Sequence, residues 1–367
     1  MKYYIIAGEA SGDLHGSNLV KEISKLDEAS IFKGVGGDLM KAQNVQTLFG
    51  LNRLAFMGFY EVIKNLRTIR RNFKQIKQAI LEFKPDVVIL IDYPGFNLRM
   101  SKWCKQQGFK VVYYISPTIW AWNEKRVETV KQYVDIMLCI LPFEKAFYEK
   151  HNYLNAHFIG HPLLDVYRHF EQSDKSVEDI HHSSFIVHRS SYIALLPGSR
   201  KQEIRKILPV MIDAANNFPN EQFVITGISR LKDLYPTELP ANISIVFDET
   251  YNVLQNAKAA IVCSGTATLE TALFNVPQVV VYKTSVLNYQ IGKRLAKVDY
   301  ISLPNLIANE KIVEELIQND CNTETITRSL NKLLNSENNR FYDSLTAKIG
   351  DSGASAKAAQ LVLDLIR

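Results

Sequence analysis

One carboxylate stands directly after an uninterrupted apolar run in the first half of the chain. Residues 87–91 read Val-Val-Ile-Leu-Ile, and Asp92 follows them at the start of a Tyr-Pro-Gly-Phe-Asn loop. Ligands of open α/β sheets bind beyond the carboxyl ends of the strands, so a carboxylate there is well placed to act as a general base. An aspartate that only caps a helix or a turn would show the same pattern, and both interpretations of Asp92 stand at this stage.

Two loops of the second half follow apolar runs and carry small and hydroxyl-bearing residues, and the first of them also contains an arginine. Residues 197–200 read Pro-Gly-Ser-Arg, and residues 264–270 read Ser-Gly-Thr-Ala-Thr-Leu-Glu. Free N–H groups at the start of a helix bind anions, and an arginine can donate two parallel hydrogen bonds to a phosphate. Together the loops predict a diphosphate site for a nucleotide-sugar, with Glu270 facing the ribose hydroxyls; singly, each could be a tight turn or a well-capped helix. The residues expected to contact this ligand are Gly198, Ser199, Arg200, Ser264, Gly265, Thr266, Thr268 and Glu270.

Motifs that would indicate other ways of holding a phosphate are missing from the sequence. The chain contains no P-loop, no clean G-x-G-x-x-G fingerprint and no Asp-x-Asp pair, which transferases that bind a diphosphate through a divalent metal commonly use. We therefore expect Arg200 and backbone N–H groups to meet the charge of the leaving group, without a metal or a cofactor. The four cysteines stand far apart with no C-x-x-C motif, and we expect them to be buried thiols.

The first half has two further loops that contain glycine. Residues 8–13 read Gly-Glu-Ala-Ser-Gly-Asp, and residues 34–37 read Gly-Val-Gly-Gly. The acidic residues of the first loop make it a poor diphosphate site and a better site for hydroxyl groups. The second loop is either a close approach of the backbone to a ligand or a plain turn. The residues expected to line the cleft here are Glu9, Ser11 and Gly36.

Residues 56–80 combine an aromatic start with a basic amphipathic pattern. Apolar residues recur at helical spacing, flanked by arginines and lysines, with no acid between Lys64 and Lys77. Such a segment is typical of an element that lies on an anionic membrane surface. A helix that buries its apolar stripe in a domain core and exposes its basic side would have the same sequence pattern. Both interpretations can be true together, with the core taking the stripe and the lipid surface taking residues 56–62. The residues expected at the membrane surface are Phe56, Met57, Phe59, Tyr60, Arg67, Arg70 and Arg71.

Length and patterning predict the elements that must position these loops. The 367 residues suffice for about two domains, and 47% hydrophobic with 22% charged residues is the mix of a soluble globular protein. Apolar runs that are continuous rather than alternating indicate strands covered on both faces, and therefore parallel sheets flanked by helices. The predicted fold class is α/β, with two doubly wound Rossmann-like domains that face a cleft.

The net charge and the lengths of the apolar runs limit the kinds of ligand and surface that the protein is expected to bind. The net charge of +5 suits an anionic ligand or lipid surface but is too small to indicate nucleic acid. No apolar run approaches the ~18–20 residues of a membrane span, and the first residues do not read as a signal peptide. Residues 1–168 are expected to form the first domain and residues 191–345 the second. The polar stretch 169–190 reads as a connection rather than a metal-binding tract, because its histidines have no spacing that fixes a coordination geometry.

Nine stretches of the chain together match one family. In order they are AGEASGD at 7–13, GVGG at 34–37, ID with FN at 91–97, YISP with WAW at 114–122, LPFE at 141–144, FIGHP at 158–162, LLPGSR at 195–200, SGTATLE at 264–270 and YISLPN at 300–305. Through them the sequence, nearly from end to end, resembles the lipid-A-disaccharide synthases, bacterial glycosyltransferases of lipid A assembly.

The resemblance implies a GT-B fold, whose final helix, here in 346–367, commonly packs back on the first domain. It implies that UDP-2,3-diacylglucosamine and 2,3-diacylglucosamine 1-phosphate give lipid A disaccharide 1-phosphate and UDP. The second domain would bind UDP, with Asn305 as a further contact, and the first would bind the acyl-sugar acceptor, with Asp92 as general base. The enzyme would need no metal and would work at the cytoplasmic face of the inner membrane, peripherally associated with it; a homodimer is left open.

Three other functions compete with this interpretation. A UDP-N-acetylglucosamine 2-epimerase, or a transferase with a soluble acceptor, would also have two domains, but the segment 56–80 disfavours a water-soluble acceptor. A non-catalytic nucleotide-binding module would not need both Asp92 and Arg200. A nucleic-acid-binding protein is disfavoured because the one dense basic run carries only Phe73 as a stacking aromatic residue.

Overall fold

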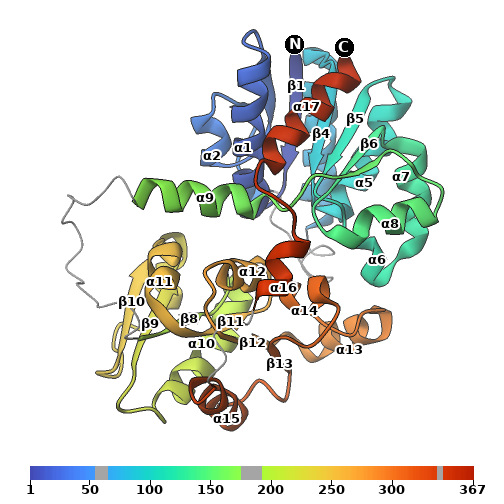
Figure 1. The fold of residues 1–367 in the computed structure, drawn as a ribbon. Coiled ribbons are helices and arrows are strands. Elements are labelled where there is room, and N and C mark those ends of the chain that lie inside the picture. Colours follow the sequence, from blue (N-terminus) through green and yellow to red (C-terminus); the bar gives the residue numbers. More distant parts are fainter. Residues whose placement is uncertain (54–64, 175–191, 337–341) are drawn as a thin grey trace. The chain divides into compact units, whose positions relative to one another are not determined.

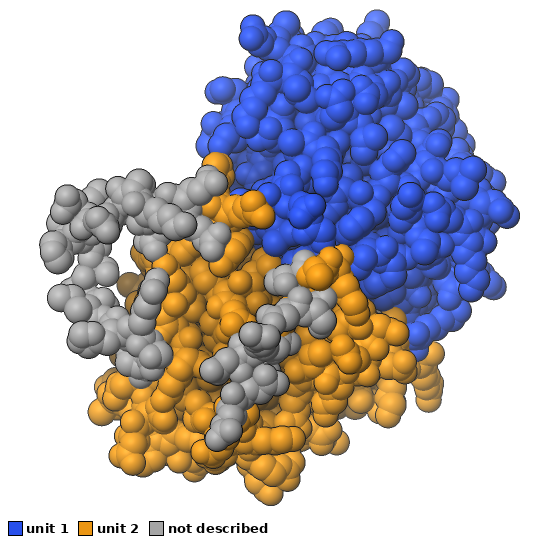
Figure 2. Space-filling view, in the orientation of Figure 1, with its two compact units in different colours: residues 1–165, 295–297, 349–367 blue, residues 166–294, 298–348 orange. Residues whose placement is uncertain are grey.

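The computed structural model describes residues 1–53, 65–174, 192–336 and 342–367. Contacts divide the chain into two compact units, which Figure 2 colours separately. Unit 1 comprises residues 1–165, 295–297 and 349–367, and unit 2 comprises residues 166–294 and 298–348. Phe56, Met57, Phe59 and Tyr60 of the expected membrane surface lie outside the described residues, as does most of the expected connection 169–190.

In the described part of the chain, unit 1 is built on a seven-stranded parallel sheet (Figure 1). In spatial order the strands are β3 (Gln46–Thr47), β2 (Ile31–Val35), β1 (Lys2–Ala7), β4 (Val87–Ile91), β5 (Lys110–Tyr114), β6 (Ile136–Cys139) and β7 (Ala156–Phe158). The central strands β1, β4 and β5 are almost completely buried, which explains their continuous apolar runs. The chain order reverses between β1 and β4, so this point is the topological switch point of the sheet.

Helices cover this sheet. They are α1 (Ala10–Leu26), α2 (Asp38–Ala42), η1 (Leu51–Arg53), α4 (Leu66–Phe83), α5 (Pro94–Gln106), α6 (Ile119–Trp122), η2 (Glu124–Arg126), α7 (Val127–Tyr133), α8 (Pro142–Lys150) and α17 (Ala354–Ile366). The final helix α17 packs along α1, which confirms the expected return to the first unit. The Asp165 carboxylate anchors the start of α17, because it accepts hydrogen bonds from the N–H groups of Gly353 at 2.5 Å and Ser355 at 2.9 Å.

Unit 2 repeats the same plan with a six-stranded parallel sheet among its described residues. In spatial order the strands are β10 (Ile243–Phe247), β9 (Gln222–Gly227), β8 (Tyr192–Leu196), β11 (Ala257–Cys263), β12 (Gln278–Tyr282) and β13 (Glu314–Ile317). The switch point lies between β8 and β11. Its helices are α10 (Lys201–Ala215), η3 (Ser229–Leu234), α11 (Thr250–Asn256), α12 (Thr266–Leu273), α13 (Val286–Leu295), α14 (Leu303–Ala308), α15 (Thr323–Leu334) and α16 (Asp343–Lys348), while α9 (Leu163–Asp174) begins in unit 1.

Both sheets therefore share one strand order, 3-2-1-4-5-6 counted within each unit, and unit 1 adds a seventh strand at one edge. This is the order of dinucleotide-binding Rossmann folds. The prediction of two doubly wound α/β domains is confirmed. In each unit the loops after the first and fourth strands leave the sheet at the switch point, where such folds bind their ligands.

Candidate active site

The switch point of unit 1 brings together two of the predicted loops. Strands β1 and β4 pair in register with Ala7 opposite Ile91, so the segments that follow them leave the sheet side by side. Glu9, Ser11 and Asp92 all come from these segments, and all three are partly exposed. A ligand at this edge of the sheet can therefore reach two carboxylates and a hydroxyl group.

The backbone at this edge adopts conformations that residues with side chains rarely take. The φ angles are 44° at Asp92, 50° at Tyr93 and 67° at Ile115, which follows the neighbouring strand β5. A left-handed conformation costs an L-residue roughly 1–2 kcal/mol, and a β-branched residue there is a marked outlier. Such strain clusters at functional sites, where the surrounding structure enforces it.

Hydrogen bonds from neighbouring residues enforce the turn at Asp92. Its N–H donates to the carbonyl of Tyr114 at 3.0 Å, and its carbonyl accepts from the Tyr113 hydroxyl at 2.6 Å and the Asn97 amide at 2.8 Å. The Asn97 amide also donates to the carbonyl of Ile91 at 3.0 Å. Three of these four bonds use the backbone of Asp92, so they hold the strained turn that carries its carboxylate.

An aromatic group packs over this turn. A Cβ atom at Gly8 would lie 2.6 Å from the ring of Tyr93, so the ring rests directly on this glycine. Tyr93 stacks on Phe96 with 5.8 Å between ring centroids, and Phe96 meets Phe73 of α4 edge to face at 5.1 Å. Burial, and then the negative charge of Glu9, raise the pKa of Tyr93 to about 12, so its hydroxyl stays protonated at neutral pH.

Gly36, expected in the cleft, packs against side chains of unit 1. A Cβ atom there would come within 2.5 Å of the Met40 sulfur and 3.3 Å of the Asp13 carboxylate. Asp13 is buried and accepts hydrogen bonds from the N–H groups of Gly37 at 2.6 Å, Leu39 at 3.1 Å and Met40 at 3.2 Å. The glycine-rich turn is therefore shaped by Asp13, whose carboxylate caps α2.

A buried carboxyl group joins the loops after β5 and β6. Glu144 accepts a hydrogen bond from the indole N–H of Trp120 at 3.1 Å, and from the N–H groups of Ile140 at 3.1 Å and Leu141 at 3.0 Å. Burial raises the pKa of Glu144 to about 7, although these hydrogen bonds act in the opposite direction. Trp120 also packs edge to face on Phe143. Glu144 thus positions Trp120 between two loops at the carboxyl edge of the sheet.

The switch point of unit 2 brings together the two loops predicted to bind a diphosphate. Strands β8 and β11 pair with Leu196 opposite Val262, so residues 197–200 and 264–270 leave the sheet side by side. Gly198 has φ 105°, and a Cβ atom there would lie 2.5 Å from the Glu203 carboxylate. A glycine is therefore required at this turn for both conformation and space.

Arg200 is half-exposed and has a partner within its own helix turn. Its guanidinium donates to Glu203 at 2.9 Å, and the N–H groups of Ser199 and Arg200 donate to the other carboxylate oxygen of Glu203 at 3.1 Å and 3.2 Å. This arrangement is a capping box at the start of α10. Part of the donor set predicted to meet a phosphate is therefore already hydrogen-bonded to Glu203.

The loop after β11 uses most of its hydroxyl groups to define its own shape. Ser264 donates to the carbonyl of Ile301 at 3.0 Å, and the fully buried Thr268 donates to the carbonyl of Gly265 at 2.8 Å. Gly265 and Thr266 are exposed. Of the predicted contacts in residues 264–268, these two are exposed, and Ser264 and Thr268 position them.

Glu270, expected to bind ribose, lies partly buried on α12. It accepts a hydrogen bond from the Tyr251 hydroxyl at 2.9 Å, and burial raises the pKa of Glu270 above its usual range. The Tyr251 ring packs on Phe274 and Phe170. One carboxylate oxygen of Glu270 is thus held by Tyr251, whose ring is itself packed in an aromatic cluster.

Asn305 is fully buried, and its amide is committed to the fold. The amide nitrogen donates to the carbonyl of Val313 at 3.0 Å and to Glu315 at 2.9 Å, and its oxygen accepts from the N–H groups of Ile312 at 2.8 Å and Val313 at 2.9 Å. Glu315 also accepts from the N–H of Ser302 at 3.0 Å. The Asn305 side chain therefore supports the segment before α14 and has no polar atom left for a ligand.

The described part of the basic segment forms α4, with its apolar stripe in the core of unit 1. Ile76 and Ile80 are completely buried, whereas Arg67, Arg70 and Arg71 are exposed. The core interpretation of the stripe is therefore confirmed for these residues, and the basic face remains open. Among the described residues, no helix has both the length and the apolar character needed to cross a membrane.

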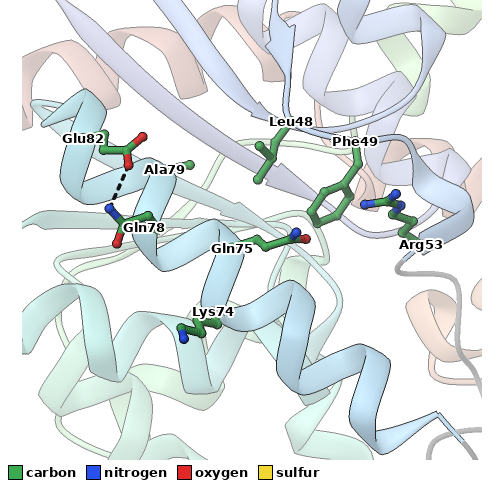
Figure 3. A pocket seen from close by; sticks show the side chains of 8 residues that line it. All are labelled: Leu48, Phe49, Arg53, Lys74, Gln75, Gln78, Ala79 and Glu82. Carbon is green, nitrogen blue, oxygen red and sulfur yellow. Dashed lines mark hydrogen bonds between the residues drawn. The ribbon is translucent and has the colours of Figure 1, made fainter.

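A pocket of about 470 Å³ lies beside α4. Figure 3 shows Leu48 and Phe49, which follow β3, on one side of it and Gln75, Gln78 and Ala79 of α4 on the other. None of its lining residues is among those predicted for the site, so the pocket is separate from the predicted contacts.

The fold of this chain is similar to the folds of several proteins that transfer sugars or that act on or bind nucleotide-sugars. The fold is similar to the glycotransferase of kitacinnamycin, with a TM-score of 0.69 and 12% identity over 100% of this chain and 99% of that one. It is also similar to the UDP-GlcNAc 2-epimerase from Neisseria meningitidis bound to UDP-GlcNAc, with a TM-score of 0.66 and 14% identity over 99% and 100% of the two chains. At such identities the likeness shows the fold alone, which is of the GT-B type.

Sequence relatives then define the family. The model of the lipid-A-disaccharide synthetase family matches residues 3–361. The lipid-A-disaccharide synthases of Geobacter sulfurreducens and Trichlorobacter lovleyi are 39% and 40% identical, over 99% of this chain and 96% and 97% of theirs. The chain belongs to the lipid-A-disaccharide synthase family and is a glycosyltransferase of lipid A biosynthesis. The family predicted from the nine motifs is confirmed, and the competing predictions are set aside.

Several residues that build the site were not assigned a role from the sequence. Glu203 could have been found from the capping-box spacing, three residues after Arg200. Asn97 and Glu144 stood within recognised motifs without a stated function. Asp13 and Glu315 act on segments far away along the chain, and no local spacing signals such contacts.

Proposed function

We propose that this chain transfers the sugar of UDP-2,3-diacylglucosamine to the 6-hydroxyl group of 2,3-diacylglucosamine 1-phosphate. The products are lipid A disaccharide 1-phosphate and UDP. Membership of the family supports this pair of substrates. The observation that carries the assignment of the base is the strained and hydrogen-bonded turn at Asp92, at the switch point of unit 1.

The reaction is a direct displacement at the anomeric carbon of the donor. The Asp92 carboxylate takes the proton of the acceptor's 6-hydroxyl group as the oxygen bonds to this carbon. The bond between the carbon and the diphosphate oxygen breaks, and UDP leaves with the electron pair. Glu9 and Ser11, on the neighbouring loop, hold hydroxyl groups of the acceptor.

Unit 2 holds the UDP group at its own switch point. The exposed backbone at Gly265 and Thr266 and the half-exposed Arg200 meet the diphosphate. Arg200 can keep its bond to Glu203 and still contact a phosphate, because a guanidinium has five N–H donors. Glu270 accepts from the ribose through the oxygen that Tyr251 does not contact.

The first test measures UDP release from UDP-2,3-diacylglucosamine in neutral detergent micelles that contain EDTA, with and without 2,3-diacylglucosamine 1-phosphate. We expect release that depends on the acceptor and persists in EDTA, because arginine and backbone N–H groups stabilise the leaving diphosphate. Release that is independent of the acceptor, or absent while UDP still binds, would contradict the proposed substrates. Release that EDTA abolishes would contradict the metal-independent mechanism.

The exposed basic face of α4 supports a position at the cytoplasmic face of the inner membrane. Arginines near an anionic surface contribute about 1 kcal/mol each. Replacing Arg67, Arg70 and Arg71 with glutamate should abolish sedimentation with vesicles that contain phosphatidylglycerol at low salt. The matched control replaces three exposed arginines of unit 2, Arg205, Arg230 and Arg328, with glutamate and should leave sedimentation unchanged. Equal loss in both variants would overturn this placement.

A further inference from the structure

Two arginines of unit 1, Arg99 and Arg126, have no acidic partner among the residues that the structure describes. Arg99 lies on α5, the helix that begins directly after Asp92 and Tyr93, and Arg126 lies at the end of η2. Helices α5 and α7 pack together, and α7 starts immediately after Arg126. Among the residues that the structure describes, neither arginine forms an ion pair or a side-chain hydrogen bond.

The acids near Arg126 are each engaged by a lysine instead. Glu124 pairs with Lys297 at 3.1 Å, and Glu128 pairs with Lys131 at 3.4 Å. Asp135, which follows α7, pairs with Lys105. The positive charge of the two arginines is therefore not neutralised locally.

Arg126 is held in place by an aromatic ring rather than by a carboxylate. Its guanidinium carbon lies 4.4 Å from the centroid of the Trp122 ring, and the residue is partly buried. Burial, and then the nearby positive charge of Arg99, lower the pKa of Arg126 below its usual range. Arg99 on α5 and Arg126 at the start of α7 thus repel each other across two packed helices, and a bound anion relieves this repulsion.

Tyr113 relates this pair to the turn that carries Asp92. The Tyr113 hydroxyl donates to the carbonyl of Asp92 at 2.6 Å. Burial is the main cause that raises the pKa of Tyr113; the charge of Asp92 raises it further, and that of Arg126 lowers it. The charges of Asp92 and Arg126 therefore both act on the buried ring of Tyr113, which is hydrogen-bonded to the turn.

We propose that Arg126 and Arg99 bind the 1-phosphate of the acceptor sugar. The proposal rests on the proposed function, in which Asp92 takes the proton of the 6-hydroxyl of the same sugar. In a pyranose one ring fixes C1 and C5, so the separation of the 1-phosphate and the exocyclic 6-hydroxyl group varies only with rotation about the bonds that join them to the ring. A phosphate site near the base therefore orients the attacking oxygen, and two guanidinium groups match a phosphate dianion.

The test compares two acceptors that differ only in the phosphate, 2,3-diacylglucosamine 1-phosphate and 2,3-diacylglucosamine, in neutral detergent micelles. Arg126→Met keeps an apolar stem on Trp122 and removes the charge. We expect kcat/KM for the phosphorylated acceptor to fall about 10–100-fold, with no change for the unphosphorylated acceptor or in KM for the donor. Arg126→Lys should recover part of the loss, and Arg126→Met with Arg99→Met should lose more than either single change.

The control is Lys125→Ala, which removes an exposed cation next to Arg126 and should leave the preference for the phosphorylated acceptor unchanged. An equal loss with both acceptors in Arg126→Met would show a structural role and overturn the proposal. A preference that survives in the double variant would overturn it too.

Two further measurements distinguish the acceptor's phosphate from a lipid headgroup and test the phosphate site without turnover. If the variants change only the response to phosphatidylglycerol added to the micelles, the arginines bind a lipid headgroup and the proposal is wrong. If the wild type shows no turnover, the proposed function has failed, and binding of glucosamine 1-phosphate then tests the phosphate site by itself.

This binding can be followed by tryptophan fluorescence, because all three tryptophans, Trp103, Trp120 and Trp122, lie in unit 1. Quenching of their fluorescence by glucosamine 1-phosphate should occur in the wild type and be lost in the double variant.

Discussion

The two units of this glycosyltransferase share a strand order but build different turns at their switch points. In unit 1 the left-handed turn after β4 is made by residues with side chains, Asp92 at φ 44° and Tyr93 at φ 50°. In unit 2 the turn after the fourth strand, β11, contains Gly265 at φ 157°, and the turn after the first strand, β8, contains Gly198 at φ 105°. A glycine opens backbone N–H groups to an anion, whereas an aspartate forced into such a turn carries a charge to the same edge. Topology sets where a site lies, and the residue at the turn sets its chemistry.

Two carboxylates around the switch point of unit 2, those of Glu203 and Glu315, accept hydrogen bonds from neighbouring protein groups. Glu203 accepts from two backbone N–H groups and from Arg200, and Glu315 accepts from Ser302 and Asn305. These bonds offset negative charge where a diphosphate is expected to bind. In unit 1 three hydrogen bonds hold Asp92 through its backbone: its carbonyl accepts from Tyr113 and Asn97, and its N–H donates to Tyr114. The difference between the units therefore predicts that unit 1 supplies the reacting base and unit 2 the binding of the leaving group.

The largest effect should come from Asp92→Asn. Asparagine tolerates left-handed φ as well as aspartate does, so the turn and its hydrogen bonds to Tyr113 and Asn97 should persist. The variant loses only the base, and we expect kcat to fall by about 10²–10⁴-fold while the Kd for UDP stays within about twofold. Steady-state kinetics and calorimetric titration with UDP measure the two quantities. A near wild-type kcat would show that Asp92 is not the general base. Weakened UDP binding would show that a residue of unit 1 also contributes to UDP binding, against the proposed roles of the two units.

The next effect concerns the buried acid that positions Trp120. Glu144 has a pKa of about 7 in the folded protein against an ordinary value of 4.5, so the folded state holds its proton more tightly. The stability from this difference is complete below pH 4.5 and is lost as the pH rises through 7, a change of about 3 kcal/mol. Glu144→Gln stays neutral at every pH and should lack this dependence.

Urea unfolding of both proteins at pH 5 and pH 8 tests this prediction. Tryptophan fluorescence reports on unit 1 specifically, because all three tryptophans lie there. The free energy of unfolding of the wild type, minus that of Glu144→Gln, should decrease by about 2.5 kcal/mol between the two pH values, because part of the difference is already lost at pH 5. A constant difference would mean that Glu144 is already ionised at pH 5 and that hydrogen bonds outweigh its burial.

The loops of both switch points could be predicted from the sequence, because continuous apolar runs mark parallel strands and the next residues must lie at the carboxyl edge. The inward-facing roles of Asn305, Thr268 and Ser264 could not. Each has a side chain that binds sugars or phosphates as readily as it binds a backbone group, and its choice depends on partners such as Ile301 and Glu315 in other segments. The sequence also could not reveal the positive φ at Asp92, since no glycine marks that turn.

The smallest effect should come from Arg200→Met, which tests whether unit 2 binds the diphosphate through a side chain or through backbone N–H groups. Arg200 is half-exposed, and its guanidinium is also bonded to Glu203. We therefore expect the Kd for UDP to rise only about 10-fold, with the Kd for uridine unchanged. Uridine lacks the diphosphate, so a loss for both ligands would mean that Arg200 acts only by shaping the turn. Arg205→Met, an exposed arginine on the same helix, is the control. If UDP affinity survives in Arg200→Met, the exposed N–H groups around Gly265 hold the diphosphate alone, and unit 2 binds its anion through backbone.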